Sequence, residues 1–353
     1  MLSSFFLGAN SGHGFHSLYK ELIDLKKAKA VYILKGGPGS GKSSLMKKVA
    51  KKAESLGYAV ERIYCSSDPD SLDGIIIPTL SKAIVDGTAP HVVEPVYPIA
   101  VERYVNLGQF ADCEKISEKK DEIIKIKEKY SGYFQHVYRL TACAEHIDNE
   151  LFDIALGGIS VEKLHAKAKG IISREISGKG ICKNTRHRFA SAISPKGYVH
   201  LPYDSAHKYS HIYVIEDSFG LGHFIFTKII EACEKSQFEC TVCHNPLKPE
   251  RIEHLIIPEL ALAFITSTKE NPFTASYYRK IRLDNMIDKE VIQKNKQRIT
   301  LLRKTRNSLI DDACDILREA KLTHDRLEDI YNPYIDFDML YKYADELADE
   351  ILQ

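Results

Sequence analysis

Short apolar runs alternate with longer stretches of helically spaced apolar residues along the first 110 positions. Residues 31–34, Val-Tyr-Ile-Leu, form an apolar, β-branched run that predicts a buried strand. After residue 43, apolar side chains recur at helical spacing until Gly57, which predicts a helix that ends there. Further strands are expected at 59–64, 83–85 and 104–107. This alternation predicts an α/β fold whose parallel sheet is flanked by helices.

The same pattern occurs twice along the chain. Residues 31–43 align with 212–224 at an offset of 181 (212 − 31), and residues 72–80 align with 252–260 at an offset of 180 (252 − 72). Between the second and third strands of each copy we expect only a short crossover. A tandem duplication explains both matches, and small loop insertions explain the drift in offset.

Each copy ends in a charged segment that carries an approximate apolar stripe at helical spacing. We therefore expect two domains, each with an appended helical hairpin. The first domain spans residues 1–180, with its hairpin at about 110–178, and the second spans 181–353, with its hairpin at about 285–353. The short segment Gly178-Lys179-Gly180 is a suitable linker.

A phosphate-binding motif lies between the first strand and the first helix. The segment Gly36-Gly37-Pro38-Gly39-Ser40-Gly41-Lys42-Ser43 has the form G-x-x-x-x-G-K-[ST] of the P-loop. Glycines let successive main-chain N–H groups converge on phosphate oxygens, and the helix N-terminus favours the same anion. Lys42 is expected to reach the β- and γ-phosphates, and Ser43 to ligate Mg²⁺. The residues expected to bind the nucleotide are Gly37, Pro38, Gly39, Ser40, Gly41, Lys42, Ser43 and Ser44.

Three carboxylates follow predicted strands of the first copy. Asp86 ends an apolar strand, as a Mg²⁺-binding carboxylate of this class should, and the aligned position of the second copy is not acidic. Asp68 and Asp73 follow the second strand, where they are candidates to hold a Mg²⁺-bound water or to orient the attacking water. Turn and helix-cap chemistry explains these two aspartates equally well. We assign catalytic roles to Lys42, Asp68 and Asp86, and Mg²⁺ binding to Ser43 and Asp86.

The second copy lacks the residues that handle phosphate. His223 aligns with Lys42, Phe224 aligns with Ser43, and Asp217 occupies the position of Gly36. A carboxylate at the loop would repel a triphosphate, and a phenyl ring offers Mg²⁺ no oxygen. We therefore expect one live site per chain and a degenerate second loop.

Several other side chains invite a functional interpretation. Phe15 and His13 have counterparts in the degenerate copy, Phe189 and His187, so we expect packing roles for them. Candidates for contact with substrate or phosphate are Thr88, His91 and Arg103, and an arginine such as Arg186 or Arg188 is a candidate to complete the live site from the second copy. The haem-attachment pattern Cys240-Thr241-Val242-Cys243-His244 overlaps a predicted strand, which favours buried thiols.

Composition narrows the possible partners. The 353 residues include 49 Lys and Arg against 48 Asp and Glu, so no net field favours nucleic acid. We expect no membrane span and no signal peptide, because no apolar run has the required length. The eight cysteines are scattered, and we interpret them as thiols of a cytoplasmic protein.

The motif block also resembles a known family. Residues 32–46, with Cys65-Ser66-Ser67-Asp68-Pro69, Ser71-Leu72-Asp73-Gly74 and residues 84–91, resemble an uncharacterised bacterial family of P-loop ATPase-like proteins with tandem domains. Its members have a similar length and come typically from spore-forming bacteria. The resemblance implies ATP binding and ATP hydrolysis, and it supplies no substrate.

Three functions are therefore open. The leading hypothesis is a Mg²⁺-dependent ATP hydrolase. The second is a P-loop kinase of a small molecule or nucleotide, in which Ser66, Asp68 and His91 line the acceptor pocket and a hairpin arginine or lysine closes as a lid. The third is an ATP-gated scaffold with negligible turnover. Each binds a nucleoside triphosphate, and the sequence leaves a further small-molecule or protein partner and the oligomeric state open.

Overall fold

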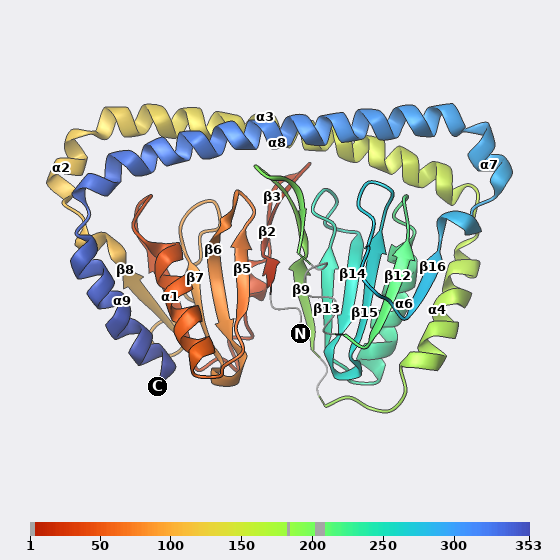
Figure 1. Ribbon diagram of the computed structural model, residues 1–353, viewed down its shortest axis with the longest axis horizontal. Coiled ribbons are helices and arrows are strands. Elements are labelled where there is room, and N and C mark those ends of the chain that lie inside the picture. Colours follow the sequence, from red (N-terminus) through yellow and green to blue (C-terminus); the bar gives the residue numbers. More distant parts are fainter. Residues whose placement is uncertain (1–3, 182–183, 202–208) are drawn as a thin grey trace.

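The computed structural model describes residues 4–181, 184–201 and 209–353. Within these residues, twelve strands form one continuous sheet, and two long helices lie across one end of the strands (Figure 1). We refer to residues 4–181 as the first half and to the described residues from 184 onward as the second half. The chain is α/β, as its sequence predicts.

The two halves have the same strand order, counted outward from the centre of the sheet. The first half contributes β1 (Ser4–Phe6), β5 (Glu61–Cys65), β6 (Asp68–Ile77), β7 (Lys82–Asp86), β4 (Ala30–Lys35) and β8 (Glu102–Asn106). The second half contributes β9 (Thr185–Phe189), β13 (Cys240–His244), β14 (Ile252–Ile257), β15 (Leu262–Ser267), β12 (His211–Glu216) and β16 (Arg279–Arg282). Two short hairpins lie outside this sheet: β2 (Gly8–Ser11) with β3 (Gly14–Ser17), and β10 (Ser191–Ser194) with β11 (Gly197–His200). This agreement in strand order matches the repeat seen in the sequence.

The sheet is mixed, so the expectation of a purely parallel sheet is wrong. β6 runs antiparallel to both of its neighbours, and β14 does the same in the second half. Only Ser66 and Ser67 separate β5 from β6, and so short a connection can join only antiparallel strands. The segment predicted as a crossover is therefore a strand, and its residues 72–77 are buried.

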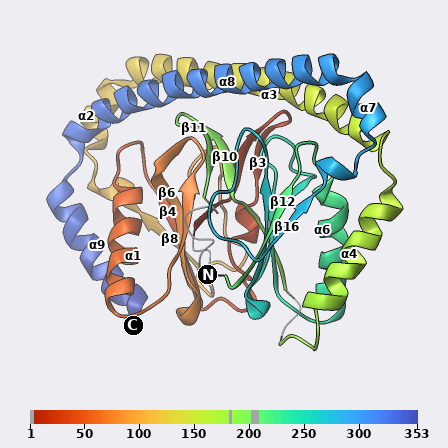
Figure 2. The ribbon, with the colours of Figure 1, turned by 45° about the vertical axis from the view of Figure 1, so that its right-hand side comes forward.

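Helices flank the outer part of each half. α1 (Lys42–Ser55) follows β4, and α6 (Gly222–Lys235) follows β12. The remaining helices in the described residues are α2 (Cys113–Glu118), α3 (Lys120–Leu156), α4 (Val161–Glu175), α7 (Lys289–Lys294), α8 (Lys296–Tyr331) and α9 (Phe337–Leu352). Figures 1 and 2 show α3 and α8 side by side across both halves.

The predicted hairpins do not form, because each terminal helix segment crosses to the opposite half. α3 has 37 residues, which makes it about 55 Å long, and it carries the chain over the second half before α4 begins. There α4 packs on α6, while α9 from the end of the chain packs on α1 of the first half. Periodicity along one helix shows that it has an apolar face and does not identify the surface that this face will cover. Whether the domain boundary lies at residue 180 stays a prediction.

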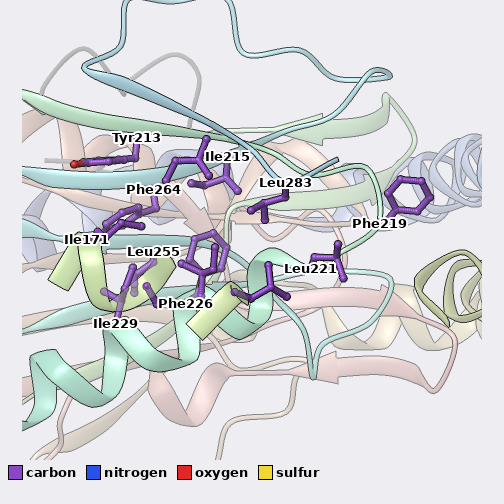
Figure 3. Close-up of a cluster of buried hydrophobic side chains, with 14 of the residues drawn as sticks. Ile171, Tyr213, Ile215, Phe219, Leu221, Phe226, Ile229, Leu255, Phe264 and Leu283 are labelled. Atoms are coloured by element: carbon purple, nitrogen blue, oxygen red, sulfur yellow. The ribbon is translucent and has the colours of Figure 1, made fainter. Parts of the chain in front are cut away.

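Three large apolar clusters hold the layers together. One lies in the second half between α6, α4 and the sheet, where Phe226 and Ile229 meet Phe264 and Ile171 (Figure 3). Its counterpart in the first half packs Leu347 and Ile351 of α9 on α1. The third cluster is shared, because Phe5, Ile63 and Val85 of the first half lie in one cluster with Val214, Cys243 and Ile265 of the second. The halves therefore share a core as well as a sheet.

A buried ion pair reinforces the junction between the halves. Phe6 of β1 pairs antiparallel with Phe189 of β9. Next to this pair, Glu61 accepts hydrogen bonds from Arg188 Nε at 3.1 Å and from Arg186 Nη2 at 2.7 Å. Arg188 is 1% exposed and also donates to the carbonyls of Glu21 and Leu22. Burial alone would raise the pKa of Glu61, but the two guanidinium groups outweigh it and hold this pKa below its usual value.

We expect Glu61→Gln to lower the free energy of unfolding by about 3 kcal/mol or more, because a buried arginine loses its counter-charge. The matched control is Glu239→Gln, which also removes a carboxylate near Arg186 (3.6 Å) but at a more exposed position. We expect this control to cost less than about 1 kcal/mol. Urea unfolding followed by circular dichroism measures both values, and equal losses would contradict the role assigned to Glu61.

Candidate functional site

The glycine-rich loop connects the end of β4 to the first turn of α1. Gly39 and Gly41 have φ angles of 69° and 73°, in the left-handed region that favours glycine. Gly41 is the N-cap of α1, and no side chain caps this helix end. The unpaired N–H groups of the first turn are therefore available to an anion, as the motif predicts.

Three predicted residues come together at this loop. Lys42 Nζ donates to the carbonyls of Gly36 at 3.1 Å and Gly37 at 3.0 Å, and it lies 3.8 Å from Asp86 Oδ2. Asp86 reaches this position because β7 pairs parallel with β4, in register at Leu34. Ser43 Oγ accepts the N–H of Leu72 at 3.0 Å.

One oxygen of Asp86 is held by a turn. The N–H and the hydroxyl of Thr88 donate to Asp86 Oδ1 at 2.8 and 2.6 Å. Only Oδ2 is therefore directed towards Lys42. Asp86 is 8% exposed, so this carboxylate lies in a largely dry environment where a cation binds more strongly than in water.

A cavity of about 620 Å³ opens beside the loop. Predicted residues that line it are Pro38, Gly39, Gly41, Lys42, Ser43, Ser44, Asp68 and Asp86. Gly37 and Ser40 belong to the loop but are not among the lining residues: Tyr331 packs over Gly37, and Ser40 is buried. The loop and the carboxylates predicted to act with it thus border one space.

The hydrogen bonds of Asp68 are those of a turn. It accepts the hydroxyl of Ser71 at 2.8 Å and the N–H of Asp70 at 3.3 Å, and its Oδ2 lies 3.5 Å from Lys321 Nζ. Asp68 also lines the cavity. Its catalytic role stays a prediction.

Sequence reasoning missed Tyr19, which organises the floor of the cavity. Its hydroxyl donates to Asp73 Oδ2 at 2.6 Å, and its ring stacks on His91 with centroids 4.3 Å apart. Burial raises the pKa of Asp73 above its usual value, while His91 and the Tyr19 hydroxyl act in the opposite direction. Tyr19 lies in a short 3₁₀ turn far from the motif, and no local pattern could have identified it.

The long helices form the other wall of the cavity. Lys127, Tyr130 and Phe134 come from α3, and Lys321 and His324 come from α8. The sequence predicted that an arginine or lysine of the helical segments would lie near the site. Lys127 and Lys321 both line the cavity, which agrees with that expectation. Lys321 belongs to the second half of the chain, so both halves contribute to the cavity.

The end of α8 also covers the loop directly. Glu328 Oε1 accepts the N–H of Gly39 at 3.3 Å. Asn332 packs so closely that a Cβ added at Gly39 would lie 2.2 Å from its Oδ1. This oxygen is buried and has no hydrogen-bond partner among the described residues. The Glu328 carboxylate therefore accepts one of the main-chain N–H groups that a P-loop motif is expected to offer to phosphate.

The loop of the second half that aligns with residues 36–43 is filled by one of its own side chains. Asp217, aligned with Gly36, accepts the N–H groups of Phe219 at 3.2 Å, Leu221 at 3.0 Å and Gly222 at 2.6 Å. It is 4% exposed, and burial raises the pKa of its carboxyl. The sequence predicted repulsion at the mouth of this loop. The carboxylate instead lies inside the loop and takes up the donors at the start of α6.

Other candidates lie outside the cavity. Arg186 and Arg188 are held at Glu61, so the expectation that one of them completes the site is wrong. Arg103 is on the surface, 3.2 Å from Glu350. Cys240 and Cys243 are buried in β13, so this pair is not exposed for haem attachment.

Three further residues discussed from the sequence do line the cavity. Phe15, which was expected only to pack, is one of them, and Ser66 and Thr88 are the others.

Comparison of the chain with protein-family models, with curated proteins and with solved structures found no match in any of the three. In the described residues, no helix combines the length and the apolar character needed to cross a membrane. The arguments below therefore depend on the geometry of the chain itself.

We expect Glu328→Gln to strengthen binding of inorganic tripolyphosphate by roughly three- to tenfold, because a negative charge leaves the loop. Glu319→Gln is the matched control, since it makes the same change on an exposed position of α8. Calorimetric titration of both variants measures the effect. Equal affinities in the two variants would show that Glu328 does not compete with phosphate.

Proposed function

We propose that the chain binds ATP with Mg²⁺ at residues 37–44 and hydrolyses it at one site per chain. The proposal includes a tandem P-loop fold in which the second copy is degenerate. The observation that supports it most directly is that Lys42, Ser43 and Asp86 line one cavity beside the uncapped first turn of α1, with Lys42 Nζ 3.8 Å from Asp86 Oδ2.

The residues at the loop suit these ligands. Main-chain N–H groups of the loop are the donors for phosphate oxygens, and Lys42 is the cation for the terminal phosphates. The carbonyls that now accept from Lys42 are those of the loop itself, so the amine can leave them for a phosphate without leaving the site. Ser43 Oγ and Asp86 Oδ2 are the oxygens suited to Mg²⁺, which neutralises developing charge in phosphoryl transfer.

Water attack needs a group that orients the nucleophile. Asp68 lines the cavity next to the loop and is held by Ser71 and Asp70, so its carboxylate is fixed in place. We assign it this orienting role. Its neighbour Lys321 would stabilise negative charge on the same side of the cavity.

Two alternatives keep support from specific observations. The cavity extends from the loop to Ser66 and His91, which suits the acceptor of a small-molecule or nucleotide kinase. Glu328 on the loop suits an ATP-gated scaffold, because binding and displacement of α8 would be linked. Phosphate release without an acceptor supports the hydrolase, turnover only in a metabolite extract supports the kinase, and binding without turnover supports the scaffold.

We expect Lys42→Ala to fold normally and to lose at least about 100-fold in ATP affinity or turnover, because the cation that contacts the terminal phosphates is gone. Lys51→Ala, an exposed lysine of the same helix, is the control and should behave like the wild type. Titration with ATP and Mg²⁺ and an assay of released phosphate measure the two quantities. Full activity in Lys42→Ala would contradict the proposed function.

A further inference from the structure

Three ionisable side chains converge on the floor of the cavity. Asp73 comes from β6, Asp86 ends β7, and His91 lies in the segment after β7. One ligand atom from each lies within 4.8 Å of the others. All three residues are buried, with exposed fractions of 6%, 8% and 6%, and all three line the cavity.

Hydrogen bonds hold both carboxylates of the cluster in place. Asp73 uses Oδ2 to accept from Tyr19, and its Oδ1 lies 4.0 Å from His91 Nε2. Asp86 uses Oδ1 to accept from Thr88. These contacts engage Asp73 Oδ2 and Asp86 Oδ1, and Cys65 at the end of β5 is a further hydrogen-bond partner of the Asp73 carboxyl.

His91 provides independent evidence for a ligand. Its Nε2 is buried and has no hydrogen-bond partner among the described residues. A buried polar atom without a partner is unfavourable by about 1–3 kcal/mol, so such atoms ordinarily face a water or an ion. Here the atom faces two carboxylates, and Lys42 supplies one positive charge against their two negative charges.

We propose that Asp73, Asp86 and His91 form a binding site for a first-row divalent transition-metal cation such as Mn²⁺ or Zn²⁺. A carboxylate pair alone would suit Mg²⁺, but an imidazole nitrogen favours the softer transition metals. Tyr19 is the positioning residue, because it bonds Asp73 and stacks on His91. The site does not require nucleotide, although Asp86 would be common to this cation and to the Mg²⁺ of the proposed function.

Two similar clusters lack this geometry. In the group His200, Glu253 and His254, the Nδ1 of His254 accepts the N–H of Thr266 at 3.0 Å. Its ring proton is therefore on Nε2, which cannot offer a lone pair. In the group His324, Asp325 and Glu328, Asp325 bonds Lys321 and Glu328 bonds the N–H of Gly39.

The test measures binding of Mn²⁺ alone to the nucleotide-free full chain, by the loss of the electron paramagnetic resonance signal of free Mn²⁺. We expect one Mn²⁺ per chain in the wild type and at least roughly tenfold weaker binding in His91→Ala, because a ligand is lost. His324→Ala, a second histidine of the same cavity, is the matched control and should bind like the wild type. Asp73→Asn keeps the size of the side chain and should also weaken binding.

Absence of a one-to-one Mn²⁺ site in the wild type, or unchanged binding in folded His91→Ala, overturns the proposal. Loss of binding in His324→Ala with retention in His91→Ala also overturns it and assigns the ion to α8. If His91→Ala does not fold, two other measurements test the proposal. Mn²⁺ should raise the thermal midpoint of the wild type, and Asp73→Asn should reduce this increase. Lys42→Ala should lose ATP and keep Mn²⁺, which separates this result from failure of the proposed function.

Discussion

The antiparallel contact between β1 and β9 is the constraint on which the rest of the molecule depends. It joins two half-sheets into one, and the neighbouring residues of both halves pack into one apolar cluster. Glu61 forms ion pairs with Arg186 and Arg188 of the opposite half. These pairs compensate the cost of removing the charges from water, and they exist only while the two halves are in contact. The halves are therefore held in one orientation, which the long helices require in order to cover both.

From this junction follows the exchange of helices. α9 completes the apolar core on α1, and α4 does the same on α6, so each half is covered by a helix from the end of the other half. The second half is consequently needed for the first: it leads the chain into α8 and α9, which cover the glycine-rich loop at residues 36–43. Its retention has a structural reason that is independent of any ligand of its own.

The two loops differ by the position of one carboxylate. In the second half Asp217 is part of the loop and takes its three N–H groups permanently. In the first half the aligned residue is Gly36, which has no carboxylate, and Glu328 on a separate helix instead accepts the N–H of Gly39. A carboxylate therefore bonds loop N–H groups in both copies, from within the loop in one and from a separate helix in the other.

These differences also explain what could be predicted from sequence. The loop, Lys42 and Asp86 were predictable because two adjacent parallel strands bring them together through local register. The sequence predicted that Asp217 would oppose phosphate binding, but it did not predict that the carboxylate lies inside the loop. A charged residue in a sequence does not show whether its side chain faces inward. Tyr19 and Glu328 meet the site through contacts that span 54 and 289 positions, and no periodicity encodes such contacts. The part of the site that a motif describes is therefore the part made by neighbouring strands, and its cover and floor depend on how distant segments pack.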